Sequence, residues 1–107
     1  MVQVVENSKK LVITLSENLG YVSEYKEWIS EVKNANVKKI KTKFDSYPFP
    51  LYAETTYEIT PLSDDTVITV TIRDDNNNDW GYHFDYLKYH FDGKQWTSEY
   101  KPNPKYH

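Results

Sequence analysis

The chain has no cysteine among its 107 residues, so no disulfide can contribute to its stability. It is rich in aromatic side chains instead, with ten tyrosines, four phenylalanines and three tryptophans. Each of these side chains buries roughly 150–250 Å² when it is packed. Because ordering one residue costs on the order of 1.5 kcal/mol, packing must supply the opposing free energy. A chain of this length supports one domain, residues 1–107, whose core we expect to be built largely from aromatic residues.

One segment has helical periodicity. From Ser23, a suitable N-cap, apolar residues recur with the i, i+3, i+4, i+7 spacing of an amphipathic helix. We expect a helix of about 13 residues that ends near Asn36, since asparagine tolerates the left-handed conformation of a helix cap. The apolar positions are Tyr25, Trp28, Ile29, Val32 and Ala35.

The rest of the chain predicts strands. In the segment 37–44, three lysines alternate with residues of the opposite face, Ile40, Thr42 and Phe44. This lysine pattern is typical of an edge strand protected against aggregation, which we favour over a phosphate-binding track. The lysines are Lys39, Lys41 and Lys43. Further strands are expected over residues 10–15, 51–60, 66–72, 80–91 and 94–100.

The predicted elements follow the order strand, helix and then five strands in an antiparallel meander. A single helix with one apolar stripe must lie across one face of such a sheet. We therefore predict an α+β fold in which one amphipathic helix packs on a curved antiparallel sheet of about five or six strands. The layout resembles that of cystatin-like folds in architecture only. The chain has no cystatin inhibitory motif, so the resemblance implies no activity.

The clearest local signal is the pair Asp92-Gly93, which predicts a two-residue hairpin turn. Such a turn places Tyr89 opposite Trp96. The residues expected to share one sheet face are Leu87, Tyr89, Phe91, Trp96 and Tyr100.

The preceding hairpin gives the opposite parity, because Ile72 is expected opposite Trp80, with residues 73–79 as the loop. A regular strand cannot bury both its even-numbered and its odd-numbered aromatics. We favour a β-bulge near Tyr86 to Lys88, which would turn both sets toward the core. Otherwise one set is exposed and forms a patch for a partner. The even-numbered set is Trp80, Tyr82, Phe84 and Tyr86.

Charge argues against a dedicated nucleic-acid binder, since the net charge is -3. Residues 45–92 carry ten acidic residues against Arg73 and Lys88, between two mildly basic ends. We favour intramolecular charge complementarity over an acidic recognition face. No segment approaches the roughly 18 apolar residues of a membrane-spanning helix. Because no signal-peptide pattern is present either, we predict a cytoplasmic protein.

No catalytic or metal site is predicted. The segment 74–79 is rich in oxygen ligands, but Asp79 occupies the position at which a calcium loop needs glycine, so a polar loop is favoured. His83 and His90 are separated by roughly 20 Å or more on one strand, at about 3.3 Å per residue. No nucleophile motif or phosphate loop is present. We therefore expect no cofactor and favour a protein that is not an enzyme.

These observations lead to one main hypothesis, a non-enzymatic protein-protein interaction module. An inhibitor, immunity or anti-defence protein of a low-GC bacterium or phage fits the small size and the use of lysine, with Arg73 the single arginine. The partner is expected to be another protein. Its binding surface is expected to comprise Asp74, Asp75, Asp79, Trp80, Tyr89, Phe91 and Trp96.

The alternative hypothesis is a small-ligand-binding domain or a small enzyme. Its pocket would lie between the helix and the curved sheet. The residues expected to line it are Trp28, Tyr82, His83 and Phe84. The sequence leaves open the oligomeric state and whether the tail, residues 101–107, is ordered.

Overall fold

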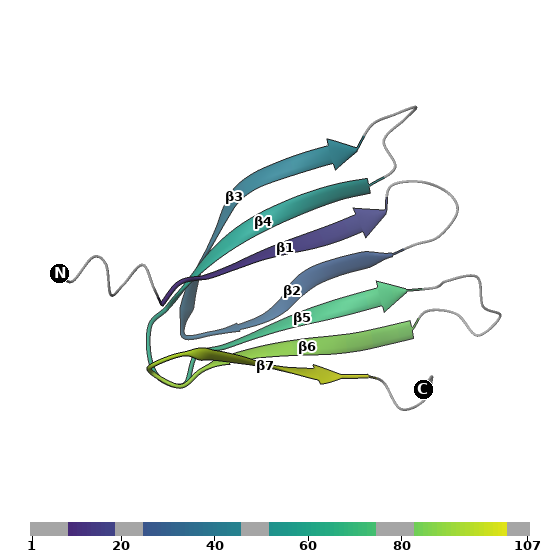
Figure 1. Ribbon diagram of the computed structural model, residues 1–107. Helices are drawn as coiled ribbons and strands as arrows, with labels where there is room; N and C mark the ends of the chain where they lie inside the picture. The colour runs from purple at the N-terminus through teal and green to yellow at the C-terminus, as the bar shows by residue number, and fades with distance from the viewer. Residues whose placement is uncertain (1–8, 19–24, 46–51, 75–82, 103–107) are drawn as a thin grey trace.

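The computed structural model describes residues 9–18, 25–45, 52–74 and 83–102. These residues form a single antiparallel sheet of seven strands in the order β3-β4-β1-β2-β5-β6-β7 (Figure 1). Within it β3 and β7 are the edge strands. For β3 this confirms the edge position that the lysines of residues 37–44 predicted. The strands are β1 (Leu11–Asn18), β2 (Lys26–Lys33), β3 (Ala35–Asp45), β4 (Tyr52–Pro61), β5 (Val67–Asp74), β6 (His83–Phe91) and β7 (Trp96–Lys101).

The predicted α+β fold is wrong, because the described part of the chain is all-β and contains no helix. The cystatin-like layout is wrong for the same reason. The segment expected to be helical forms β2 and the beginning of β3. No described helix is therefore long and apolar enough to cross a membrane.

A β-bulge in β2 explains why this strand has the spacing of a helix. Ile29 pairs with Val70 of β5 and Val32 pairs with Ile68, but the register shifts between Ile29 and Glu31. The extra residue lets two apolar residues three positions apart pair with even-numbered residues of β5. A helix face shows the same spacing of three, so periodicity alone does not separate the two structures.

A corner at Asn34 connects β2 to β3, which are not neighbours in the sheet. Asn34 has a φ of 55°, the left-handed conformation that we expected at Asn36. Its carbonyl accepts the N–H of Leu62 at 2.9 Å and the Thr66 hydroxyl at 2.5 Å, and its side chain donates to Asp65 at 2.9 Å. Leu62 to Thr66 connects β4 to β5. The two connections are thus hydrogen-bonded to each other at one end of the sheet.

The core lies where β1 and β2 diverge. These strands pair at Glu17 and Lys26, and Figure 1 shows the gap that opens between them toward the other end. The central cluster joins the β3-β4-β1 half of the sheet to the β2-β5-β6-β7 half. Contrary to the expected aromatic core, its centre is aliphatic, and several aromatic side chains pack around it. The cluster consists of Ile13, Leu15, Ile59, Ile68 and Val70.

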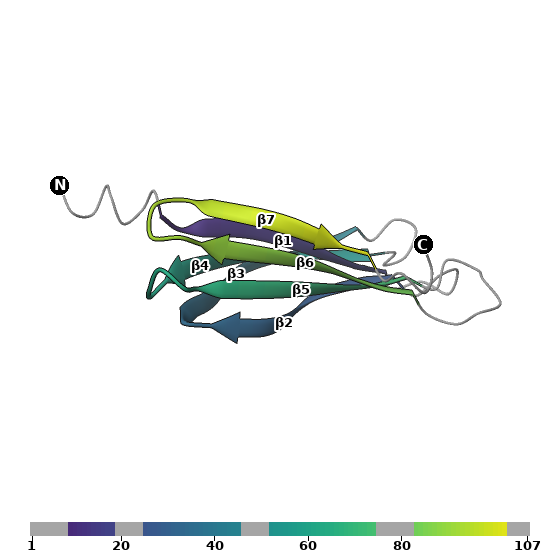
Figure 2. The same ribbon diagram turned by 90° about the horizontal axis from the view of Figure 1, so that it is seen from below.

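The β2-β5-β6-β7 half curves so that β7 returns toward the beginning of β1 (Figure 2). There the indole N–H of Trp96 donates to the carbonyl of Lys9 at 2.6 Å. The Trp96 ring also packs against Phe91, with 5.3 Å between the ring centroids. Trp96 therefore links the far edge of the sheet to the beginning of β1.

β5 and β6 pair along their whole lengths without a register shift. The favoured bulge near Tyr86 to Lys88 is therefore absent, and Ile72 lies opposite Asp85 rather than Trp80. A regular strand turns only one aromatic set toward the core. In the described part of β6, Tyr89 and Phe91 lie on the core side, and Phe84 and Tyr86 lie on the opposite face.

The β6-β7 hairpin has the predicted face but a different register. Phe91 pairs with Trp96, so the connection has four residues rather than two. Its Asp92 carboxylate accepts the backbone N–H groups of Gln95 and Lys94 at 2.9 and 2.8 Å. These bonds, Gln95 foremost, lower the pKa of Asp92. The glycine after Asp92 has a φ of 97°, a conformation that glycine adopts without steric cost, so a turn is present at Asp92-Gly93 although it is not the predicted two-residue turn.

Candidate protein-interaction surface

The residues predicted to bind a partner do not form one surface in the described part of the chain. Phe91 is only 4% exposed, and Tyr89 and Trp96 are half-buried against the core cluster. Asp74 is the last residue of β5, at the end of the β5-β6 pair that is farther from Phe91, and its backbone pairs with His83. Lying outside the described residues are Asp75, Asp79 and Trp80.

The predicted pocket between helix and sheet has no counterpart, because no helix covers the described sheet. Trp28 and Phe84, expected to line it, lie on the face of the β2-β5-β6-β7 half that is opposite the core. His83 begins β6, and Tyr82 lies outside the described residues. The pocket hypothesis therefore loses its structural basis.

Two rows of side chains cross this outer face near the C-terminal ends of β5 and β7. In one row Trp28 lies opposite Thr71, Thr71 opposite Tyr86, and Tyr86 opposite Lys101. The neighbouring row joins Lys26, Arg73 and Phe84. We call the following six residues the aromatic-basic patch: Lys26, Trp28, Arg73, Phe84, Tyr86 and Lys101.

The patch combines exposed aromatic surface with positive charge. Tyr86 is 38% exposed, and Trp28 is half-buried. The Lys26 ammonium lies 5.8 Å from the centroid of the Trp28 ring, within the range of a cation-π interaction. At the rim, Lys101 forms an ion pair with Glu99 at 3.2 Å. Lys26 likewise lies 4.0 Å from the carboxylate of Glu17 in β1, so the patch has acidic neighbours at its β1 side as well as at its β7 side.

A hydrogen-bonded ladder lies beside the patch and holds β2 against β5. Thr71 donates to the Ser30 hydroxyl at 2.7 Å, and Thr69 donates to the Glu31 carboxylate at 2.6 Å. Both threonines are 5% exposed although they lie on the outer face. Buried and bonded side chains of this kind fix the spacing of the two strands, so Trp28 is presented on a rigid support.

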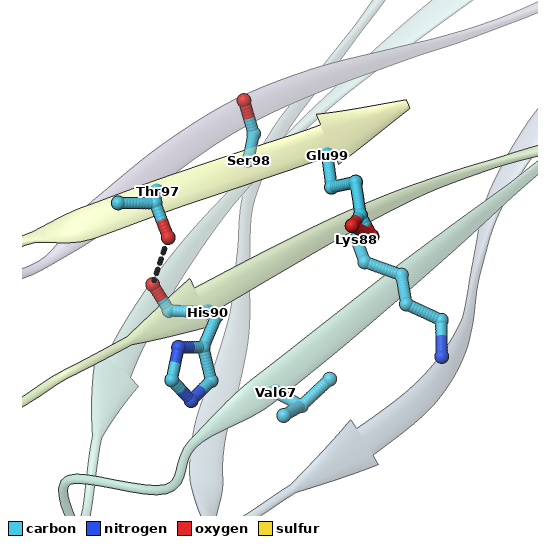
Figure 3. A pocket seen from close by; sticks show the side chains of 6 residues that line it. All are labelled: Val67, Lys88, His90, Thr97, Ser98 and Glu99. Atoms are coloured by element: carbon cyan, nitrogen blue, oxygen red, sulfur yellow. Dashed lines mark hydrogen bonds between the residues drawn. The ribbon is translucent and has the colours of Figure 1, made fainter. Parts of the chain in front are cut away.

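An open depression lies on the same outer face, toward the hairpin end of β6 and β7 (Figure 3). It has a volume of about 550 Å³ and mixed polar and apolar walls. The Thr97 hydroxyl donates to the His90 carbonyl at 3.4 Å across it. In the residues that the structure describes, no group of three or more His, Asp or Glu could hold a metal ion. Its lining residues are Val67, Lys88, His90, Thr97, Ser98 and Glu99.

Some acidic residues of the middle segment pair with lysines from the N-terminal part of the chain. Glu58 lies 3.3 Å from Lys10, and Asp65 lies 3.8 Å from Lys33. The pKa of Asp65 is lowered by hydrogen bonds from Ser63 and Asn34 and by the charge of Lys33. These pairs agree with the charge complementarity favoured from the sequence.

The position of Trp28 on the outer face was not predicted, because this residue was assigned to the apolar stripe of a helix. Side-chain alternation gave no sign of a strand here, because the two polar residues Lys26-Glu27 are followed by the two apolar residues Trp28-Ile29. No protein-family model, curated protein or solved structure matches the chain.

Proposed function

We propose that the protein is a non-enzymatic interaction module that binds another protein through the aromatic-basic patch. The observation that carries this proposal is that Trp28 and Tyr86 lie in one row of one outer face, flanked by cations. Tryptophan, tyrosine and arginine are the residues most enriched at the energetic centres of protein interfaces. The patch contains all three types.

The charge of the patch indicates the kind of partner surface that it fits. Lys26, Arg73 and Lys101 favour an acidic partner, with the aromatic rings contacting apolar side chains. This differs from the acidic recognition face considered from the sequence. A small domain that binds in this way acts by covering a surface of its partner, so we retain an inhibitor, immunity or anti-defence role as part of the proposal.

The expected result of replacing Trp28 with alanine is at least a tenfold loss of partner capture. Removal of a large ring at the centre of an interface typically costs 2 kcal/mol or more, roughly 30-fold in affinity. The measurement uses immobilised full-length protein, a nuclease-treated lysate of the source organism and quantitative mass spectrometry of the captured proteins.

Val12→Ala is the matched control, because Val12 is an exposed residue of β1 outside the patch. It should capture as much partner as the wild type. The proposal is contradicted if no stoichiometric protein is captured, or if Trp28→Ala captures the same amount while remaining folded by circular dichroism. Capture that nuclease treatment abolishes would instead indicate a nucleic-acid ligand and would also contradict it.

A further inference from the structure

The strand β3 presents an open edge. Among the described strands it pairs with β4 alone. All of its side chains from Asn36 to Phe44 are exposed, and three of them are apolar. Val37 is 37%, Ile40 44% and Phe44 59% exposed. An edge with exposed apolar side chains and unpaired backbone groups is a template for another strand.

A bulge divides this edge into two parts. The register with β4 shifts between Lys39 and Lys41, and from Lys41 to Asp45 it is regular. Along this second part, Lys41 and Lys43 lie on one face, and Thr42 and Phe44 lie on the other. The segment 41–45 is therefore a regular strand edge with two lysines on one face, where Lys43 lies opposite Glu54 of β4, and with a partly apolar other face.

The lysines of this edge favour some partner strands over others and do not block strand addition altogether. A second copy of the segment would bring Lys41 and Lys43 beside the same lysines, and like charges opposite each other destabilise a strand pair. An acidic strand meets no such repulsion and gains opposite-charge pairs. The same two side chains that prevent self-association thus favour an acidic partner over a second copy.

We propose that the edge formed by residues 41–45 binds an extended acidic segment of a partner protein, which adds to the sheet as a further strand beside β3. Acidic side chains of this segment would lie beside Lys41 and Lys43, and apolar side chains beside Phe44. The sheet order places β3 at the edge opposite β7 (Figure 1). The site is therefore separate from the aromatic-basic patch, and the proposal does not depend on the function of that patch.

The test uses the full chain and a fluorescein-labelled peptide of four Glu-Val repeats, followed by fluorescence anisotropy at low ionic strength. This peptide should bind at least tenfold more tightly than four Lys-Val repeats. It should also bind at least tenfold more tightly than a Glu-Val peptide with proline at one central valine, because proline keeps the charge but interrupts the strand. Hydrogen exchange of the amides of residues 41–45 should slow when the Glu-Val peptide binds.

The Lys41→Glu/Lys43→Glu double variant should lose at least tenfold in affinity for the Glu-Val peptide and gain affinity for the Lys-Val peptide. Trp28→Ala should leave both affinities unchanged, so this site and the aromatic-basic patch can fail separately. Absence of Glu-Val binding by the folded protein would overturn the proposal. Equal binding of the proline peptide, or tighter binding of an eight-nucleotide oligothymidine, would overturn it as well, since either result would show attraction by charge alone.

Discussion

Replacing Ile59 with alanine is expected to lower the free energy of unfolding by about 2–5 kcal/mol. Ile59 is completely buried and pairs with Leu11 of β1 on one side and Val37 of β3 on the other. It belongs to the cluster that joins the two halves of the sheet. Because small domains are stable by only about 5–15 kcal/mol in total, the loss is a large fraction of the whole.

Ile40→Ala provides the matched control for this experiment. Ile40 is also a strand isoleucine, but it is 44% exposed at the bulge of β3. Its replacement should change the free energy of unfolding by only about 0.5 kcal/mol. Urea denaturation followed by tryptophan fluorescence measures both variants. Similar losses in the two would contradict the position of the core.

Glu27→Ala is expected to lower the free energy of unfolding by about 2–3 kcal/mol, in the range of hydrogen bonds to a charged group. The Glu27 carboxylate accepts the backbone N–H of Ser16 and the hydroxyl of Tyr25, both at 2.7 Å. These bonds lie where β1 and β2 meet, next to the pair formed by Glu17 and Lys26. Their loss would weaken the junction between the two halves of the sheet.

A second measurement tests the position of Glu27 without reference to stability. Burial raises the pKa of Tyr89, and the negative charge of Glu27 raises it further. The titration of the Tyr89 ring, followed by nuclear magnetic resonance so that it is separated from the other tyrosines, should therefore move toward lower pH in Glu27→Ala, by less than the whole shift because burial is the larger cause. An unchanged titration would show that the carboxylate does not face Tyr89.

Glu58→Ala is the control for the loss of one carboxylate. Glu58 is about as accessible as its partner Lys10, with 30% and 31% of their side chains exposed. A partly exposed ion pair of this kind contributes about 0–1 kcal/mol. A loss in Glu58→Ala as large as that in Glu27→Ala would mean that Glu27 has no special position in the fold.

Several strands could be predicted because their signals are local. The alternating lysines of residues 37–44, the apolar alternation of residues 66–72 and the Asp92-Gly93 turn all lie in strands or turns of the structure. Each signal depends on neighbouring residues only, through side-chain alternation or the φ angle of a turn. Local chemistry was therefore sufficient for most of β3 and β5 and for the presence of a turn between β6 and β7, but not for the length of that turn.

The sheet order and the bulge in β2 could not be predicted in this way. β1 pairs with β4 and β2 pairs with β5, so neither pair comes from adjacent strands of the chain. Such pairings depend on contacts between distant segments, which local periodicity does not report. Of the meander that we expected, the β3-β4 pair and the β5-β6-β7 run are present, but β4 and β5 are not neighbours.

The candidate surface was predictable only in part. The parity conflict in the β6 aromatics correctly indicated that an exposed set was one of two solutions, and Tyr86 belongs to that set. We favoured the other solution because a bulge would have buried more aromatic surface. Trp28 belongs to the patch because β2 pairs with β5. That pairing could not be predicted once the segment was assigned to a helix.

The most direct test of this structure is the conformation of residues 26–33, because β2 places Trp28 on the same face as Tyr86. Nuclear Overhauser spectra of isotope-labelled protein should show contacts across the strands from Trp28 to Thr71 and from Ile29 to Val70. The Cα chemical shifts of the segment should have the sign of a strand. Contacts between residues three apart along the segment, together with helical Cα shifts, would contradict both the all-β fold and the aromatic-basic patch.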